Sequence, residues 1–216
     1  MTEDNNDPMT VEALCREATK CRTCFDHNAV NAPMIDIAQP RWIGDGYWAS
    51  SPRICVMMPH PSVGNDHNVS ANVRMQSLLQ RFSSDEARLD DVFRLQRADF
   101  QNWGNPTGRF LNFFRNFGLD IDRIALANVA WCATVNNRHP RHMLDTCMGR
   151  WTGRLVSLLE PDVVMLSGSK THVYGDQVSH LTPRACIFRT LHFAHRKGDA
   201  EEAIEAQRFR DFLVAI

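Results

Sequence analysis

The sequence of 216 residues lacks several features that assign a protein to a broad class. It contains no apolar run of about 18 residues, so we expect no transmembrane helix. Its N-terminus, MTEDNNDPMT, is acidic and polar and lacks the basic and apolar regions of a signal peptide. We therefore expect a cytoplasmic protein whose residues 1–10 form a disordered tail.

An excess of charge is also absent, because 24 Lys and Arg residues oppose 25 Asp and Glu residues. This balance provides no overall attraction to nucleic acid, so contact with DNA would need a local basic patch. The 44% of hydrophobic residues is enough for a substantial core. We expect one domain over residues 11–216, without internal repeats or low-complexity segments.

Segments rich in β-formers alternate with helical segments, which predicts crossover connections and a mainly parallel sheet. Strands are expected at four runs: residues 53–58, 123–131, 162–168 and 185–190. Helices are expected at five amphipathic stretches: residues 11–20, 70–101, 107–117, 141–159 and 199–214. The predicted fold class is therefore α/β, a three-layer αβα arrangement around a four-stranded sheet. Ligands of such folds bind at the carboxyl ends of the strands.

Seven cysteines in a reducing compartment argue against disulfides and favour metal ligation or simple burial. Cys21 and Cys24 form a CxxC pair, and Cys132 and Cys147 form a second pair further along. Four thiolates in two pairs suit a tetrahedral metal site or an iron–sulfur cluster, and the spacing does not separate the two. The alternative is that they are small buried apolar residues. The remaining cysteines are interpreted as core or spare thiols: Cys15, Cys55 and Cys186. Of these, Cys15 is a weak rival for a ligand position.

Together the motifs of this chain resemble those of the family 4 branch of the uracil-DNA glycosylase superfamily, from Cys21 to the C-terminus. They follow one another as CRTC at 21–24, MPHPS at 58–62, NVAWC at 128–132, NNRHP at 136–140, LSG at 166–168 and LHF at 191–193. The most specific stretch is Cys132-ATVNNRHPRHMLDT-Cys147. The resemblance implies a uracil-DNA glycosylase-like fold, a DNA partner, hydrolysis of a glycosidic bond, and a structural [4Fe-4S] cluster on Cys21, Cys24, Cys132 and Cys147. We further expect a monomer with a helical insertion at about 68–100.

The chain departs from the family pattern where the family binds and activates its substrate. Pro59, His60 and Ser62 replace residues of the family's GEAPG loop, and Phe193 replaces the proline of its late HP motif. We therefore expect excision of a modified pyrimidine, with glucosylated 5-hydroxymethylcytosine of phage DNA as the first candidate, in antiviral defence. Ordinary uracil repair is the alternative. A non-catalytic DNA-binding iron–sulfur protein is an alternative of another class, and a zinc-ribbon-like structural protein is the least favoured.

Three residues are expected to bind the extruded base. Trp103 aligns with the family's stacking aromatic, although it could equally be a core tryptophan. Asn128 ends a predicted strand, where its amide could read a pyrimidine edge or merely cap a turn. His60 could supply a hydrogen-bond partner to a hydroxyl on a larger base.

Three further residues are expected to act in the chemistry. Asp66 would orient the attacking water and stabilise the cationic sugar, although an aspartate after a glycine is also common in turns. Asn65 is the runner-up for the water. His192 matches the family's late histidine, which donates a hydrogen bond to the leaving base. Without that match it would be interpreted as one of several surface histidines.

Basic and amide side chains near two of the expected loops could hold the DNA backbone. The candidates are Asn137, Arg138, His195 and Arg196, with Arg150 and Arg154 extending the first group along the next helix. The alternative for the first group is an ordinary solvated helix start.

Overall fold

The computed structural model describes residues 10–24, 35–61, 69–103, 108–134, 139–194 and 199–216. At its centre lies one four-stranded sheet with the order β2-β1-β3-β4, in which all described pairings are parallel. The strands are β1 Ile54–Met58, β2 Ile124–Asn128, β3 Val163–Ser167 and β4 Cys186–Thr190. All four predicted strands are confirmed. The second ends at Asn128, before the predicted end at residue 131.

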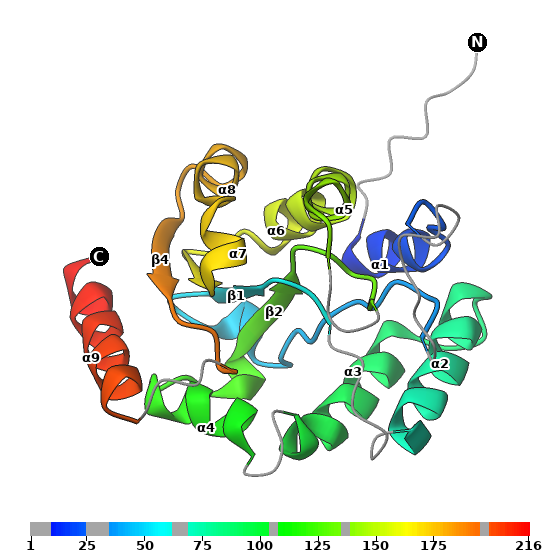
Figure 1. Cartoon of the computed structure of the whole chain (residues 1–216), viewed down its shortest axis with the longest axis horizontal. Helices are drawn as coiled ribbons and strands as arrows, with labels where there is room; N and C mark the ends of the chain where they lie inside the picture. The colour runs from blue at the N-terminus through cyan, green and yellow to red at the C-terminus, as the bar shows by residue number, and fades with distance from the viewer. Residues whose placement is uncertain (1–9, 25–34, 62–68, 104–107, 135–138, 195–198) are drawn as a thin grey trace.

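Helices cover both faces of this sheet, which confirms the α/β class and the αβα layering (Figure 1). Helices α5, α6, α7 and α8 lie on one face and α4 and α9 on the other. The α-helices are α1 Val11–Thr19, α2 Val69–Ser83, α3 Leu89–Asp99, α4 Arg109–Asn116, α5 Arg141–Cys147, α6 Gly153–Leu159, α7 Ser169–His172, α8 Gly175–Leu181 and α9 Asp199–Ala215. Short 3-10 helices are η1 Tyr47–Ala49, η3 Phe100–Asn102 and η4 Ile121–Arg123. No described helix is both long and apolar enough to span a membrane.

Three differences from the predicted helices stand out. The helix expected over residues 70–101 is a pair, α2 and α3, and whether this pair is an insertion stays a prediction. The helix expected over 141–159 contains a π-helical turn at Met148–Thr152. Helices α7 and α8 occupy a crossover in which no helix was predicted. Of the disordered tail expected at residues 1–10, residues 1–9 lie outside the described residues, whereas Thr10 is ordered as the N-cap of α1, where its hydroxyl accepts from the N–H of Ala13 at 3.1 Å.

The outer edge of β2 is covered by a segment that precedes β1. Ile43 forms an antiparallel bridge with Ala125, and the backbone N–H of Leu126 donates to the carbonyl of Trp42 at 2.7 Å. The N–H of Gly44 donates to the carbonyl of Ile124 at 2.9 Å. These bonds satisfy backbone groups that an open edge would leave unpaired, and they bring residues 39–44 alongside the end of β2.

The carboxyl end of β2 is anchored to the π-helical turn by one buried hydroxyl. Thr152 is fully buried, and its Oγ1 donates to the carbonyl of Asn128 at 2.7 Å and lies 3.0 Å from that of Val129. The indole Nε1 of Trp131 donates to the same hydroxyl at 2.9 Å. Because π-helical turns inside helices often mark functional sites, the position of this turn directs attention to the end of β2.

We predict that Thr152→Val lowers the free energy of unfolding by about 1–3 kcal/mol, because it leaves the buried Trp131 indole N–H and a carbonyl without partners. Denaturant unfolding followed by circular dichroism measures this change. The matched control is Ser84→Ala, which removes an exposed hydroxyl that bonds to backbone carbonyls of its own helix and should change stability by less than about 0.5 kcal/mol. Equal effects in the two variants would contradict the anchoring role.

Candidate functional site at the carboxyl edge of the sheet

The parallel strands bring residues from four distant segments to one edge of the sheet, and three of these residues have polar side chains. His60 follows β1, Asn128 ends β2, Gly168 follows β3 and His192 follows β4. Gly168 has a φ of 96°, and a Cβ on it would lie 3.1 Å from the Cβ of His192. Glycine therefore allows the end of β3 to approach His192 closely, and this edge is the one at which a ligand is expected.

Asn128 is the most distinctive residue of this edge. Its side chain is buried, with 1% of the residue exposed, and neither its Oδ1 nor its Nδ2 has a hydrogen-bond partner among the described residues. Buried amides in folded proteins nearly always have such partners. The side chain of Asn128 therefore does not cap a turn or helix among the described residues. The amide offers one acceptor and a donor group to a ligand at the sheet edge.

His60 stacks on a second histidine, His139, with ring centroids 3.6 Å apart and 14° between the planes. Its Nδ1 donates to the carbonyl of Pro61 at 3.3 Å, which leaves Nε2 as an acceptor in the neutral ring. Burial, followed by the neighbouring His139, lowers the pKa of His60 to about 3, with smaller contributions from Lys170 and His192. Those contributions place Lys170 and His192 in the surroundings of His60.

His139 was not recognised in the sequence, although it stands in the NNRHP motif. It is buried, and its Nε2 lies 3.0 Å from the carbonyl of Cys132, to which it can donate. Its Nδ1 lies 3.2 Å from the hydroxyl of Thr134. His139 therefore connects the loop after β1 to the segment after β2.

His192 is partly buried, and its tautomer is set by the backbone. The N–H of Ala194 donates to its Nδ1 at 3.1 Å, so the proton of the neutral ring is on Nε2, which can donate to a ligand. Its ring lies 4.3 Å from that of Phe193. The ring of Phe193 in turn lies 5.1 Å from that of Phe110, so Phe193 packs on the aromatic core.

Trp103 lies where this aromatic core reaches the surface. It is partly buried and makes edge contacts with Phe100 and Phe110, at centroid distances of 4.7 and 5.0 Å. The guanidinium carbon of Arg41 lies 5.0 Å from the centre of its ring. The ring is thus supported by the core while part of it remains accessible, a combination that a stacking platform requires.

The four cysteines of the two pairs converge. Cys24 and Cys132 are side-chain hydrogen-bond partners, and this bond is the main cause that lowers the pKa of Cys24 to about 7. The hydrogen bond with Cys24 and burial raise the pKa of Cys132, and the nearby Cys147 and Cys21 raise it further. The backbone N–H of Trp131 donates to the sulfur of Cys147 at 3.2 Å. The pKa values of two other cysteines, Cys15 and Cys55, are not affected by this group. Like Cys186, both are free thiols.

Within the described ranges, no three Cys, His, Asp or Glu side chains are spaced to hold a single metal ion. A zinc site places four thiolates around one ion, whereas a four-iron cluster binds its thiolates on different irons. The convergence of the four cysteines does not decide between zinc and a cluster, so the cluster stays a prediction; the amide bonded to the sulfur of Cys147 is a contact that both kinds of site can use.

Several predicted site residues lie outside the described residues: Asn65, Asp66, Asn137, Arg138, His195 and Arg196. The two arginines expected to extend the basic group are engaged elsewhere. Arg150 donates to the hydroxyl of Thr23 at 2.7 Å, and Arg154 lies 3.8 Å from the carboxylate of Glu17. Both contacts join exposed arginines to the N-terminal segment, and their part in a DNA-binding cluster stays a prediction.

No family model matches this chain, and a search of curated proteins returns no match.

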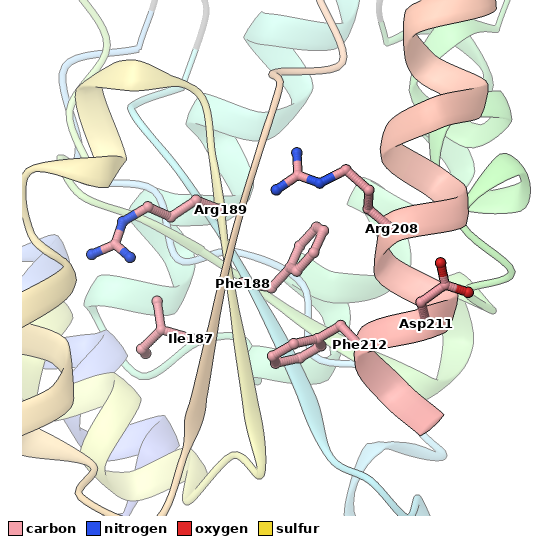
Figure 2. Close-up of a pocket in the computed structure, with 6 residues that line it drawn as sticks. All are labelled: Ile187, Phe188, Arg189, Arg208, Asp211 and Phe212. Carbon is pink, nitrogen blue, oxygen red and sulfur yellow. The ribbon is translucent and has the colours of Figure 1, made fainter. Parts of the chain in front are cut away.

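A pocket of about 490 Å³ lies elsewhere, between β4 and α9. Figure 2 shows Phe188 and Phe212 side by side within it, with Arg208 reaching from α9 toward the strand. Arg189 extends to the opposite side of the strand. None of the pocket's lining residues belongs to the carboxyl edge, so the pocket is not part of the candidate site.

We predict that His60→Phe makes the protein less sensitive to acid. The folded-state pKa of His60 lies below its ordinary value of 6.5, so the unfolded chain binds the extra proton and stability falls as pH drops below that value toward about 3. The Phe ring keeps the stacking on His139 and removes the titration. Denaturant unfolding at about pH 7.5 and about pH 4.5 should show a smaller loss of stability than in the wild type.

The control is His180→Gln, which changes an exposed histidine of α8 and should retain the acid sensitivity of the wild type. An identical loss of stability in His60→Phe and wild type would show that His60 does not resist protonation.

Proposed function

We propose that this protein is a DNA glycosylase that extrudes a modified pyrimidine and hydrolyses its glycosidic bond, leaving an abasic site. The observation that carries the proposal is the unpaired, buried amide of Asn128 at the carboxyl end of β2. A pyrimidine edge presents adjacent donors and acceptors, which are the groups that such an amide needs. Trp103, His60 and His192 come from other segments and supply a stacking surface and further polar contacts.

The polar groups at this edge favour a base larger than uracil. The Nε2 of the neutral His60 is an acceptor, so it can receive a hydrogen bond from a hydroxyl group. Each hydroxyl of a sugar attached to the base needs such a partner when it is removed from water. Glucosylated 5-hydroxymethylcytosine of phage DNA is the first candidate, which corresponds to a role in antiviral defence.

The reaction consumes one water molecule. The bond between the base nitrogen and the sugar carbon breaks, its electron pair leaves with the base, and the water oxygen bonds to that carbon. Asp66 orients this water and accepts its proton, which the released base finally takes up. Asn65 is the alternative for orienting the water, in which case the proton passes to the departing base through solvent. The Nε2–H of His192 donates a hydrogen bond to the base as negative charge develops on it.

We also propose that Cys21, Cys24, Cys132 and Cys147 hold a [4Fe-4S] cluster that is structural. These residues join the segment after α1, the segment after β2 and the end of α5. When bound, the cluster would cross-link three regions that the local hydrogen bonds hold only in part. Asn137, Arg138, His195 and Arg196 flank the site in sequence and are proposed to bind the DNA backbone, with the protein acting as a monomer.

We predict base release from duplex DNA that carries glucosylated 5-hydroxymethylcytosine, and weak or no release from DNA that carries uracil. Abasic sites formed under single-turnover conditions, with unmodified DNA as control, measure both rates. Fast uracil release with no action on the modified DNA would restore ordinary uracil repair. DNA binding without release from either substrate would favour the non-catalytic alternative.

We predict that Asn128→Ala slows base release by roughly a hundredfold or more, while the free energy of unfolding changes by less than about 1 kcal/mol because the amide has no partner to lose. Asn116→Ala is the matched control, since Asn116 is an exposed asparagine that bonds to Glu202 at 2.6 Å. Wild-type rates in Asn128→Ala would remove the residue from the base pocket.

We predict that protein purified without oxygen is brown, absorbs broadly near about 400 nm and contains about four irons per chain. Alanine at any of the four ligand cysteines should abolish the colour and reduce soluble yield, whereas Cys55→Ala and Cys186→Ala should retain it. Metal analysis and the visible spectrum provide the measurement. Stoichiometric zinc in the wild type would overturn the cluster assignment.

A further inference from the structure

Arg41 is a buried cation that forms no ion pair with a carboxylate of the described residues. It is 8% exposed, and within the described part of the chain its Nε has no hydrogen-bond partner. Its guanidinium group lies over the ring of Trp103, whose centre is 5.0 Å from the guanidinium carbon. Other arginines of this chain, such as Arg97 with Asp122, are exposed to a greater extent and pair with carboxylates.

This arrangement is unfavourable in the free protein. Burial lowers the pKa of Arg41 to about 10, so the side chain remains charged at neutral pH. A buried charge is costly unless it is paired, and an aromatic ring compensates only part of the cost. A group that costs stability without a structural partner is commonly retained for a ligand.

The position of Arg41 indicates which ligand this is. Ile43 pairs with Ala125, and the carbonyl of Trp42 accepts from the N–H of Leu126, so Arg41 lies in the segment that runs alongside the carboxyl end of β2. Its other neighbour is Trp103, the proposed stacking surface. A base that stacks on this indole therefore lies beside the guanidinium, because both contact the same ring. A phosphate of the DNA backbone is a poorer candidate because Arg41 is withdrawn from the surface.

We propose that Arg41 is a catalytic residue that contacts the extruded base and stabilises the negative charge that develops on it as the glycosidic bond breaks. The inference rests on the proposed glycosylase function. The electron pair of the broken bond moves onto the base, and the guanidinium N–H groups donate to the base oxygen that shares this charge. The water proton later neutralises the base, so Arg41 neither gains nor loses a proton.

The unpaired Nε2 of Gln39 supports this assignment. Gln39 is 4% exposed, lies two residues before Arg41, and its backbone N–H donates to the carbonyl of Trp131 at 2.8 Å. Three buried side chains, Gln39, Arg41 and Asn128, thus have N–H groups without partners among the described residues near the end of β2. An excess of unpaired donors favours a ligand that is rich in acceptors and becomes negative during the reaction.

The test compares Arg41→Met and Arg41→Lys with wild type in single-turnover base release, DNA affinity and thermal unfolding. On the substrate that wild type cleaves, Arg41→Met should slow release by about a hundredfold, with the dissociation constant for DNA changed less than about threefold. Arg41→Lys should recover part of the rate, since the charge remains. The melting temperature of Arg41→Met should equal or exceed that of wild type, because an unpaired buried charge is removed.

Arg97→Met is the matched control: it removes an arginine that is paired with Asp122 at 2.6 Å, and it should lower the melting temperature while leaving base release unchanged. If the wild type releases a base and Arg41→Met releases it at a rate within about threefold of wild type, the inference is overturned and the proposed function stays intact. A lowered melting temperature in Arg41→Met would assign it a structural role and also overturn the inference. Wild type that releases no base from any tested DNA would reject both.

Discussion

The hydroxyl of Thr152 is the contact on which the arrangement of this edge depends. It joins the π-helical turn between α5 and α6 to the carbonyl of Asn128 and to the indole of Trp131. The backbone of Trp131 then holds the sulfur of Cys147, and the segment that follows carries Cys132. One buried hydroxyl thus positions the amide proposed to read a base and the thiols proposed to hold a cluster.

A second constraint is the concentration of unsatisfied polar atoms at this edge. Among the described residues, buried side-chain atoms without partners belong to few residues, and Gln39, Arg41 and Asn128 are close to one another along β2 and its neighbouring segment. The same amide and guanidinium would destabilise a purely structural domain. Their presence at this edge is explained if an acceptor-rich ligand completes their hydrogen bonds.

The sequence predicted the features that depend on local pattern. Apolar runs such as Ile54–Met58 form central strands because they are buried on both faces, and Asn128 could be placed at a strand end because it closes such a run. Features that depend on distant contacts were missed. His139 acquires its role by stacking on His60, and Arg41 by lying beside β2 and Trp103. Helix α8 begins at Gly175, whose backbone packs against Arg189, a contact that no local pattern reveals.

The central claim is that the side-chain amide of Asn128 contacts an extruded base, and nuclear magnetic resonance tests it directly. Protein with isotope-labelled asparagine is titrated with duplex DNA that carries a glucosylated 5-hydroxymethylcytosine nucleotide on a fluorinated, cleavage-resistant sugar. The amide signals of Asn128, assigned by their absence from Asn128→Ala, should shift on binding and should not shift with unmodified DNA. Unmoved Asn128 signals in protein saturated with the modified DNA would contradict the account.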